Sequence, residues 1–128
     1  MASIEEVDAF LKNAKELRLH LLCEKEHLEG LDRLVPPDLR ELCAGSELEA
    51  RLEEEVEGAT DSIAALADEV AEVEAVLSKL PEVEAGVLRM RYLEGKGWKD
   101  ISSETFFCLG HVSGAVHRRA KEYLREVI

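Results

Sequence analysis

Residues 47–80 read ELEARLEEEVEGATDSIAALADEVAEVEAVLSKL, and this stretch decides the fold class. Its apolar residues recur at gaps that alternate between four and three: Leu52, Val56, Ala59, Ile63, Leu66, Val70, Val73, Leu77 and Leu80. Such a heptad pattern is typical of a helix that packs lengthwise against another helix in a coiled coil. Gly58 costs about 1 kcal/mol relative to Ala, but the pattern continues through it. We therefore expect one uninterrupted helix.

The preceding residues predict the partner helix. Apolar side chains at spacings of three, four and seven form one stripe: Val7, Phe10, Leu11, Ala14, Leu17, Leu21, Leu28 and Leu31. Ser3 with Glu6, and Ser46 with Glu49, are capping-box pairs that predict the two helix starts. Pro36-Pro37 ends the first helix, and residues 38–43 are expected to form one short helical turn.

Two helices of roughly 30 and 34 residues, each about 45–50 Å long at 1.5 Å per residue, then form an antiparallel coiled-coil hairpin over residues 1–80. A hairpin of two helices buries only a narrow seam, and further apolar residues lie off it: Leu22, Leu34, Leu39, Leu48, Ala64, Ala67 and Val76. The simplest cover for them is a homodimer formed through the hairpins. The alternative is that the hairpin folds against its own C-terminal domain.

Composition narrows the class further. The chain has 128 residues, 46% of them apolar, which is too many for a disordered acidic tail. Only 5% are aromatic, which disfavours a β-sandwich. The three cysteines form no CxxC pair, and neither a leader segment nor an apolar run of the ~20 residues that span a bilayer is visible. We expect a cytoplasmic, all-α protein that does not enter a membrane.

Charge divides the chain at Leu80-Pro81. Residues 1–80 hold 21 acids and 8 bases, whereas residues 81–128 hold 7 acids and 8 bases. The net charge of −12 therefore describes the first part and hides a locally basic second part. DNA would be repelled by the first and tolerated by the second. We place the boundary between two functional domains here.

Residues 81–128 predict a helix, a turn at 94–97, a short helix from Trp98, a second turn at 107–110 and a longer final helix. Trp98 is expected to pack the short helix onto the first one. The final helix should turn its apolar residues inward: Val112, Val116, Ala120, Tyr123, Leu124 and Val127. Its other face is polar and basic: His111, Ser113, Gly114, His117, Arg118, Lys121 and Arg125. A short helix, a tight turn and a longer basic helix indicate a helix-turn-helix.

The run Leu80-Pro81, Val87-Leu88-Arg89-Met90-Arg91-Tyr92-Leu93-Glu94-Gly95 and Trp98-Lys99-Asp100-Ile101-Ser102 resembles region 4 of bacterial sigma factors, which reads promoter −35 elements. Together with the N-terminal helical segment, it is similar to small region-4-like regulators encoded by phages and prophages. The resemblance covers about 48 of 128 residues. Relative to that family, Phe106-Phe107 adds one residue to the turn. The resemblance implies a transcription regulator in the cytoplasm of a bacterial host.

An α-helix fits the major groove, small residues at its start permit close approach, and cations neutralise phosphates. The predicted DNA contacts are therefore the polar face of the final helix, with Lys96 and Lys99 beside the first turn. The histidines would gain charge near pH 6. About four phosphate contacts would give a slope of log K against log salt near −3 to −4.

Other chemistry is not indicated. His20, Cys23, Glu24 and His27 share a helix face at metal-ligand spacings, but we interpret them as structural because no second ligand cluster is visible. No nucleophile elbow, phosphate loop or catalytic triad spacing is present. We expect no catalytic residues, metal or cofactor.

Three functions follow from this pattern. The leading hypothesis is a regulator that binds double-stranded DNA through residues 109–125, with the acidic hairpin dimerising or contacting RNA polymerase. The second is an adaptor that binds RNA polymerase or a sigma factor through its coiled coil without reading DNA. The third is a structural coiled coil whose basic end caps the bundle.

Overall fold

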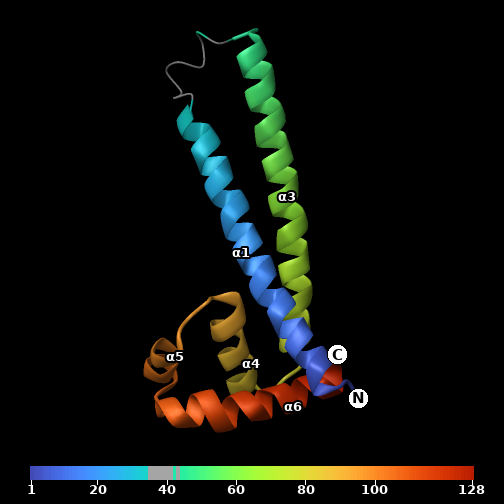
Figure 1. Ribbon diagram of the computed structural model, residues 1–128, viewed down its shortest axis with the longest axis vertical. Helices are drawn as coiled ribbons and strands as arrows, with labels where there is room; N and C mark the ends of the chain where they lie inside the picture. Colours follow the sequence, from blue (N-terminus) through green and yellow to red (C-terminus); the bar gives the residue numbers. More distant parts are fainter. Residues whose placement is uncertain (35–41, 43) are drawn as a thin grey trace. The chain divides into compact units, whose positions relative to one another are not determined.

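The computed structural model describes residues 1–34, 42 and 44–128, and within these the regular structure is entirely helical. The all-α prediction is therefore confirmed. The elements, in chain order, are α1 (Ile4–Leu34), α3 (Glu47–Leu77), α4 (Glu82–Leu88), η2 (Arg89–Leu93), α5 (Trp98–Thr105), η3 (His111–Val116) and α6 (His117–Val127) (Figure 1). The two η elements are wider, π-helical turns. No helix in the described ranges combines the length and the apolar composition that crossing a bilayer would require.

Both long helices begin at the predicted caps. The Glu6 amide donates to Ser3 Oγ at 3.1 Å, and the Ser3 amide donates to Glu6 Oε2 at 3.3 Å. The Glu49 amide likewise donates to Ser46 Oγ at 3.2 Å. α3 continues through Gly58 as expected, but it ends at Leu77 rather than at residue 80. The helical turn predicted for residues 38–43 lies, except for Leu42, outside the described residues.

The last residues of the expected 80-residue seam form a tight turn instead. The amides of Lys79 and Leu80 each donate to the carbonyl three residues earlier, both at 3.1 Å. These shorter steps turn the chain toward Pro81, which cannot donate to a helix. Leu80 is nevertheless buried, at 7% exposure.

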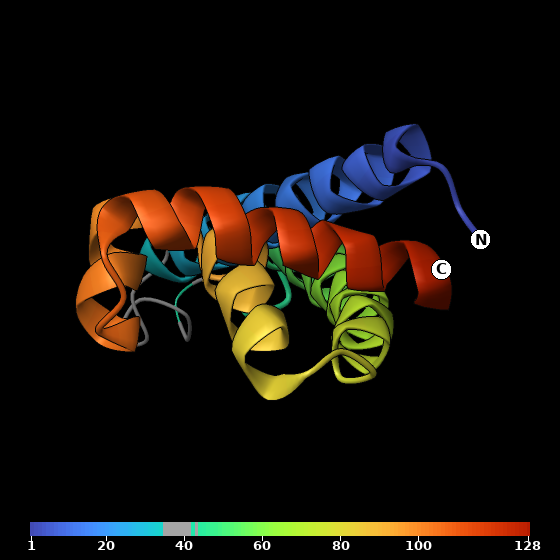
Figure 2. The ribbon, with the colours of Figure 1, turned by 90° about the horizontal axis from the view of Figure 1, so that it is seen from below.

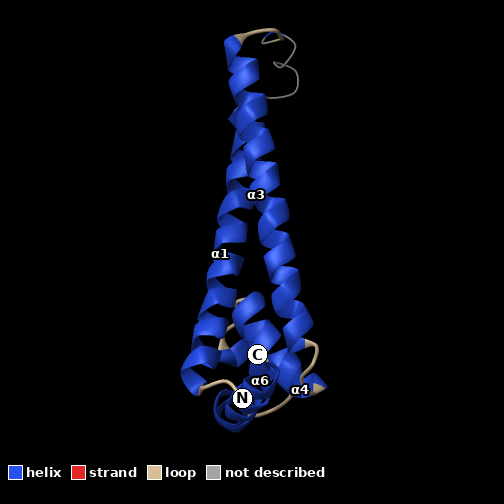
Figure 3. Cartoon of the chain, turned by 90° about the vertical axis from the view of Figure 1, so that its right-hand side faces the viewer, coloured by secondary structure: helices blue, strands red, loops and turns tan. Residues whose placement is uncertain are grey.

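The chain divides into two compact units, one made of residues 1–18 and 69–128 and the other of residues 19–68. In the second unit, the C-terminal part of α1 and the N-terminal part of α3 lie side by side (Figure 3). Its buried apolar residues are Leu31, Ala59 and Leu66, whereas Leu22 remains 42% exposed.

The first unit joins the start of α1 and the end of α3 to the C-terminal helices. Its larger core contains Val7, Leu11, Ala14, Val73, Leu77, Leu80, Ala85, Leu88, Ala120 and Leu124. Residues before and after position 80 therefore share one core, as in the alternative in which the hairpin folds against its own C-terminal domain. The change of charge at Leu80-Pro81 does not coincide with a limit of either compact unit.

A smaller core holds α4, α5 and the start of the final helix together. Val87, Ile101, Val112 and Val116 are fully buried, and Met90, Trp98 and Phe107 pack against them. The prediction that Trp98 packs the short helix onto the preceding one is confirmed. In Figure 2, α6 runs across α4, and α5 lies beside η3, the turn that precedes α6.

The final helical stretch, residues 109–127, keeps Val112, Val116, Ala120 and Leu124 buried at a strict spacing of four. At 3.6 residues per turn, this spacing drifts around an α-helix by about 40° per step. The wider turn η3 (His111–Val116) holds more residues per turn and offsets the first step. The π-helical turn therefore keeps Ala120 in the core, although the turn before the final helix is one residue longer than in the resembling family.

One predicted core position differs from the structure, and one apolar residue of α4 lies outside the core. Tyr123 was expected to face inward but is 37% exposed, because the buried row at every fourth residue passes through Leu124. In α4, Val83 is 43% exposed, whereas its neighbour Glu84 is buried. The ion pair between Glu84 and Arg119 explains why the carboxylate is buried and the valine is exposed.

Candidate nucleic-acid interface

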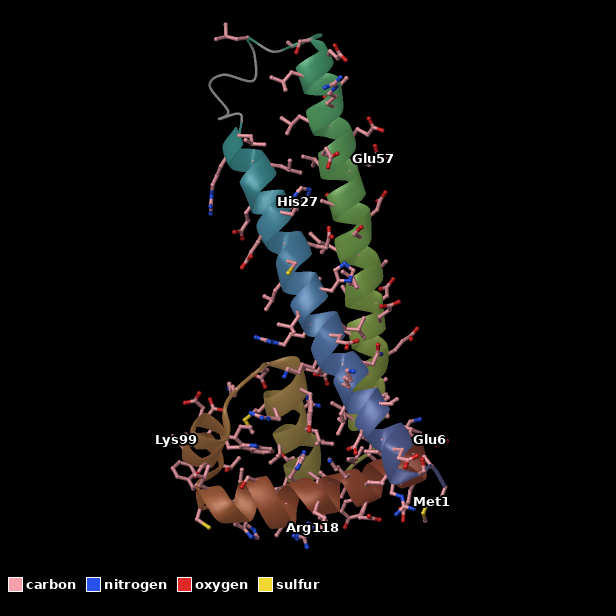
Figure 4. The ribbon with its side chains drawn as sticks, in the orientation of Figure 1. Met1, Glu6, His27, Glu57, Lys99 and Arg118 are labelled. Atoms are coloured by element: carbon pink, nitrogen blue, oxygen red, sulfur yellow. The ribbon has the colours of Figure 1, made fainter. Side chains whose placement is uncertain are left out.

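The outward side of the final helix carries the exposed residues Arg118 and His111. Figure 4 shows Arg118 pointing away from α4 and α5. In the described part of the chain, its guanidinium has neither a hydrogen bond nor an ion pair. The ring of His111 meets the Phe107 ring edge-on, with centroids 5.3 Å apart. Lys99, on the outer side of α5 in Figure 4, is exposed and likewise unpaired among the described residues.

Two other predicted contacts anchor the final helix to the N-terminal residues. The Lys121 ammonium lies 2.8 Å from Asp8 Oδ1 in α1, and the lysine side chain is 24% exposed. Arg125 Nε donates to the Ala2 carbonyl at 2.9 Å, and the Ala2 amide donates to the Arg125 carbonyl at 2.9 Å. A third contact joins Arg125 to Glu122 at 3.1 Å. Both cations therefore already have partners within the chain.

His117 faces inward rather than toward solvent. Its Nε2 shares a hydrogen bond of 2.9 Å with the Tyr92 hydroxyl, and its ring meets Trp98 edge-on at a centroid distance of 4.9 Å. On Trp98 rests the guanidinium of Arg91, 4.7 Å from the ring centroid. The four residues tie η2, α5 and α6 together.

Burial, followed by the positive charges of Lys121 and Arg91, lowers the pKa of His117 to about 4, and the negative charge of Asp8 opposes this shift. Burial also raises the pKa of the Tyr92 hydroxyl. The expectation that His117 gains charge near pH 6 is therefore wrong. The half-buried ring is neutral at that pH, since protonation would place a third cation beside Lys121 and Arg91.

Of the remaining residues predicted to contact DNA, Lys96 and Ser113 bind groups within the chain, whereas Gly114 borders open space. Lys96 lies 2.7 Å from Glu104 and 3.4 Å from Glu94, and the hydrogen bond that its ammonium donates to Glu104 raises the lysine pKa. Ser113 is half-buried and donates to the Leu109 carbonyl at 2.8 Å. Gly114 has open space where a side chain would begin, so it presents bare backbone at the start of the helix.

The sequence pattern missed the ion pair between Arg119 and Glu84, whose Nε and Oε1 lie 2.6 Å apart. Glu84 is 6% exposed and is the buried charged residue of the described part of the chain. Arg89 makes a similar bond to Glu74 at 2.8 Å. The spacing of apolar residues does not predict such ion pairs. A charged residue such as Glu84 on the buried face of a helix interrupts the apolar pattern, so the pattern places it at the surface.

Phe106 was also missed as a candidate site residue. It ends α5 in the left-handed backbone region, with φ of 62°, and its side chain is 94% exposed. Its neighbour Phe107 instead turns into the smaller core. The one-residue extension of the turn thus brings one aromatic ring into the core and leaves the other in solvent.

The helix face that has metal-ligand spacings, interpreted from the sequence as structural, carries one ion-pair contact within α1 and one to α3. His20 lies 3.7 Å from Glu24, and His27 lies 3.6 Å from Glu55. Across the described ranges, no group of three or more His, Cys, Asp or Glu side chains is placed to hold a metal ion.

Comparisons of the chain with protein-family models, with curated proteins and with solved structures gave no match. The resemblance to sigma-factor region 4 therefore stays a prediction that rests on the quoted motif.

Proposed function

We propose that this chain is a DNA-binding transcription regulator whose helix-turn-helix consists of α5, the turn at 106–108 and the final helix. The observation that carries the proposal is the outward placement of Arg118 and Lys99, two exposed cations on adjacent helices without partners in the described part of the chain. Their helices share the small core of Val87, Ile101, Val112 and Val116. A cationic surface held on a rigid base suits a duplex, because its geometry needs little ordering on binding.

In this arrangement the final helix enters the major groove with its first turns foremost. Gly114 allows the backbone to come near the base edges, and His111 lies within the same turns. Arg118, one turn further on, neutralises a phosphate, and Lys99 contacts the backbone from α5. Two unpaired cations give a slope of log K against log salt near −2, shallower than the four contacts expected from sequence would give.

The acidic helices serve a second role in this proposal. Within residues 19–68, Leu19 and Leu22 are 45% and 42% exposed, and a second copy of the chain would cover them. Dimerisation would also place two helix-turn-helices on one duplex, as in two-fold symmetric regulators. The region-4 resemblance adds a phage or prophage origin, a bacterial cytoplasm and an RNA polymerase partner to the proposal.

A second candidate is the adaptor that binds RNA polymerase or a sigma factor without reading DNA. The pairing of Lys121, Arg125 and Lys96 with acidic or carbonyl groups favours it, because these cations are then not free for phosphates. The net charge of −12 also favours the adaptor, because it repels DNA.

Fluorescence anisotropy with a labelled pool of random duplexes at 50 mM salt separates the two candidates. A regulator binds the pool, and the double variant Arg118→Ala with Lys99→Ala loses about tenfold or more in affinity. Arg33→Ala, which removes an 81% exposed arginine in the other compact unit, is the matched control and leaves binding unchanged. Absence of binding by the wild-type chain, together with retention of RNA polymerase on a column of the chain, supports the adaptor.

A further inference from the structure

Phe106 combines two unfavourable features in one residue. Its ring is 94% exposed, and its backbone lies in the left-handed region at φ 62°. A bulky residue is strained in this region, and glycine is the usual residue at such a helix end. In the described part of the chain, the ring makes no aromatic or cation contact.

The neighbouring turn at Glu94–Gly97 shows the alternative that the chain uses elsewhere. There the left-handed position is occupied by Gly95, at φ 71°. The chain thus uses glycine at the left-handed position before α5, but phenylalanine at the one after α5. An exposed aromatic ring at this strained position is explained if the ring contacts a molecule outside the chain.

The surroundings of Phe106 favour nucleic acid over an apolar protein surface. Lys99 lies two turns earlier on α5, and His111 and Arg118 lie on the helix that follows the turn. Each of these three side chains is exposed. The two cations, Lys99 and Arg118, complement phosphates, and an apolar partner would have to desolvate them without pairing them.

We propose that Phe106 is a specificity-determining contact that packs against the C5-methyl group of a thymine. This inference rests on the proposed DNA binding. The turn that carries Phe106 directly precedes the helix that enters the major groove, and the thymine methyl is the apolar group displayed in that groove. Among protein side chains, phenylalanine is one that contacts this methyl. The ring therefore adds selectivity for thymine beside the site that the final helix reads.

The test uses duplexes selected from a random pool on the wild-type chain, synthesised either with thymine or with uracil. Uracil lacks only the methyl group. The wild-type chain should lose about threefold to fivefold in affinity on the uracil duplex, as expected for one buried methyl group. Phe106→Gly should bind both duplexes equally, and it should fold because glycine relieves the strained backbone.

The possible outcomes test the thymine contact separately from DNA binding itself. If the wild-type chain retains no duplex from the pool, both are overturned, and if it retains duplexes without enriching any sequence, only the thymine contact is overturned. If the wild-type chain binds thymine and uracil duplexes equally, DNA binding stands and the thymine contact is overturned. If Phe106→Gly retains the full thymine preference, or loses affinity equally on both duplexes, the ring does not recognise the methyl group and the inference is again overturned.

Discussion

The ammonium of Lys121 in α6 lies 2.8 Å from the carboxylate of Asp8 in α1. A residue that the sequence places on a DNA-binding face is therefore also an anchor for the first helix. Asp8 and a DNA phosphate would compete for the same cation. This relationship limits how many positive charges the final helix can offer to a duplex.

Asp8→Asn should release Lys121 and increase affinity for duplex DNA severalfold at low salt. One more phosphate contact should steepen the slope of log K against log salt by about 0.9. The loss of the ion pair should lower the free energy of unfolding by less than about 1 kcal/mol, because Asp8 is 55% exposed. Anisotropy over a series of salt concentrations measures both binding effects.

Glu16→Gln is the matched control, because it removes an exposed carboxylate from the same helix. If both variants change affinity equally, the effect is one of net charge alone, and competition by Asp8 is rejected.

Arg119→Ala should lower the free energy of unfolding by about 1–3 kcal/mol, because it leaves the buried Glu84 carboxylate without its partner. Arg118→Ala, one residue earlier, should change it by less than about 0.5 kcal/mol, since Arg118 is exposed. Urea unfolding followed by circular dichroism compares the two. Equal effects would show that the ion pair between α4 and α6 adds no stability.

Stability should fall as the pH is lowered from about 6.5 to about 4. In this window the unfolded chain protonates His117, whose ordinary pKa is 6.5, whereas the folded chain does so only near pH 4. The unfolded state then binds more protons, so the free energy of unfolding rises with pH, by less than about 1.4 kcal/mol per unit from this group. The full contribution of His117 to the free energy of unfolding is present above pH 6.5.

His117→Gln should remove this contribution while keeping a hydrogen-bonding group near Tyr92. The difference between the wild-type and variant unfolding free energies, measured from pH 4 to pH 8, isolates the histidine from the carboxylates. Parallel curves would contradict the assignment.

Phe106→Gly should raise the free energy of unfolding by about 1 kcal/mol, because glycine adopts the left-handed backbone without strain and no core contact is lost. Gly95→Ala should have the opposite effect. It introduces strain at φ 71°, and its Cβ would meet the Arg18 guanidinium. Thermal unfolding of the two variants checks the pair, and destabilisation by Phe106→Gly would show that the ring supports the fold.

Periodicity predicts the helices well here because each has one continuous apolar face. The caps at Ser3 and Ser46 and the buried row Val112, Val116 and Leu124 follow directly from residue spacing. The spacing of these residues also agrees with the wider turn η3, although the pattern alone does not reveal a π-helical turn.

Side-chain pairing is where the sequence prediction stops. The polar face of a helix shows which cations are outward, but not that Asp8, more than a hundred residues earlier, reaches Lys121. The same applies to Arg125 with Ala2 and to the burial of His117 against Tyr92 and Trp98. These contacts depend on tertiary packing between distant segments, which a local pattern does not contain.

The salt dependence of duplex binding tests the central claim most directly. The wild-type chain should bind a random duplex pool at micromolar concentration, with a slope of log K against log salt near −2 for each bound chain. Arg118→Ala should reduce that slope to about −1. Absence of binding at 50 mM salt, or a slope that Arg118→Ala leaves unchanged, would contradict a DNA-binding surface on the final helix.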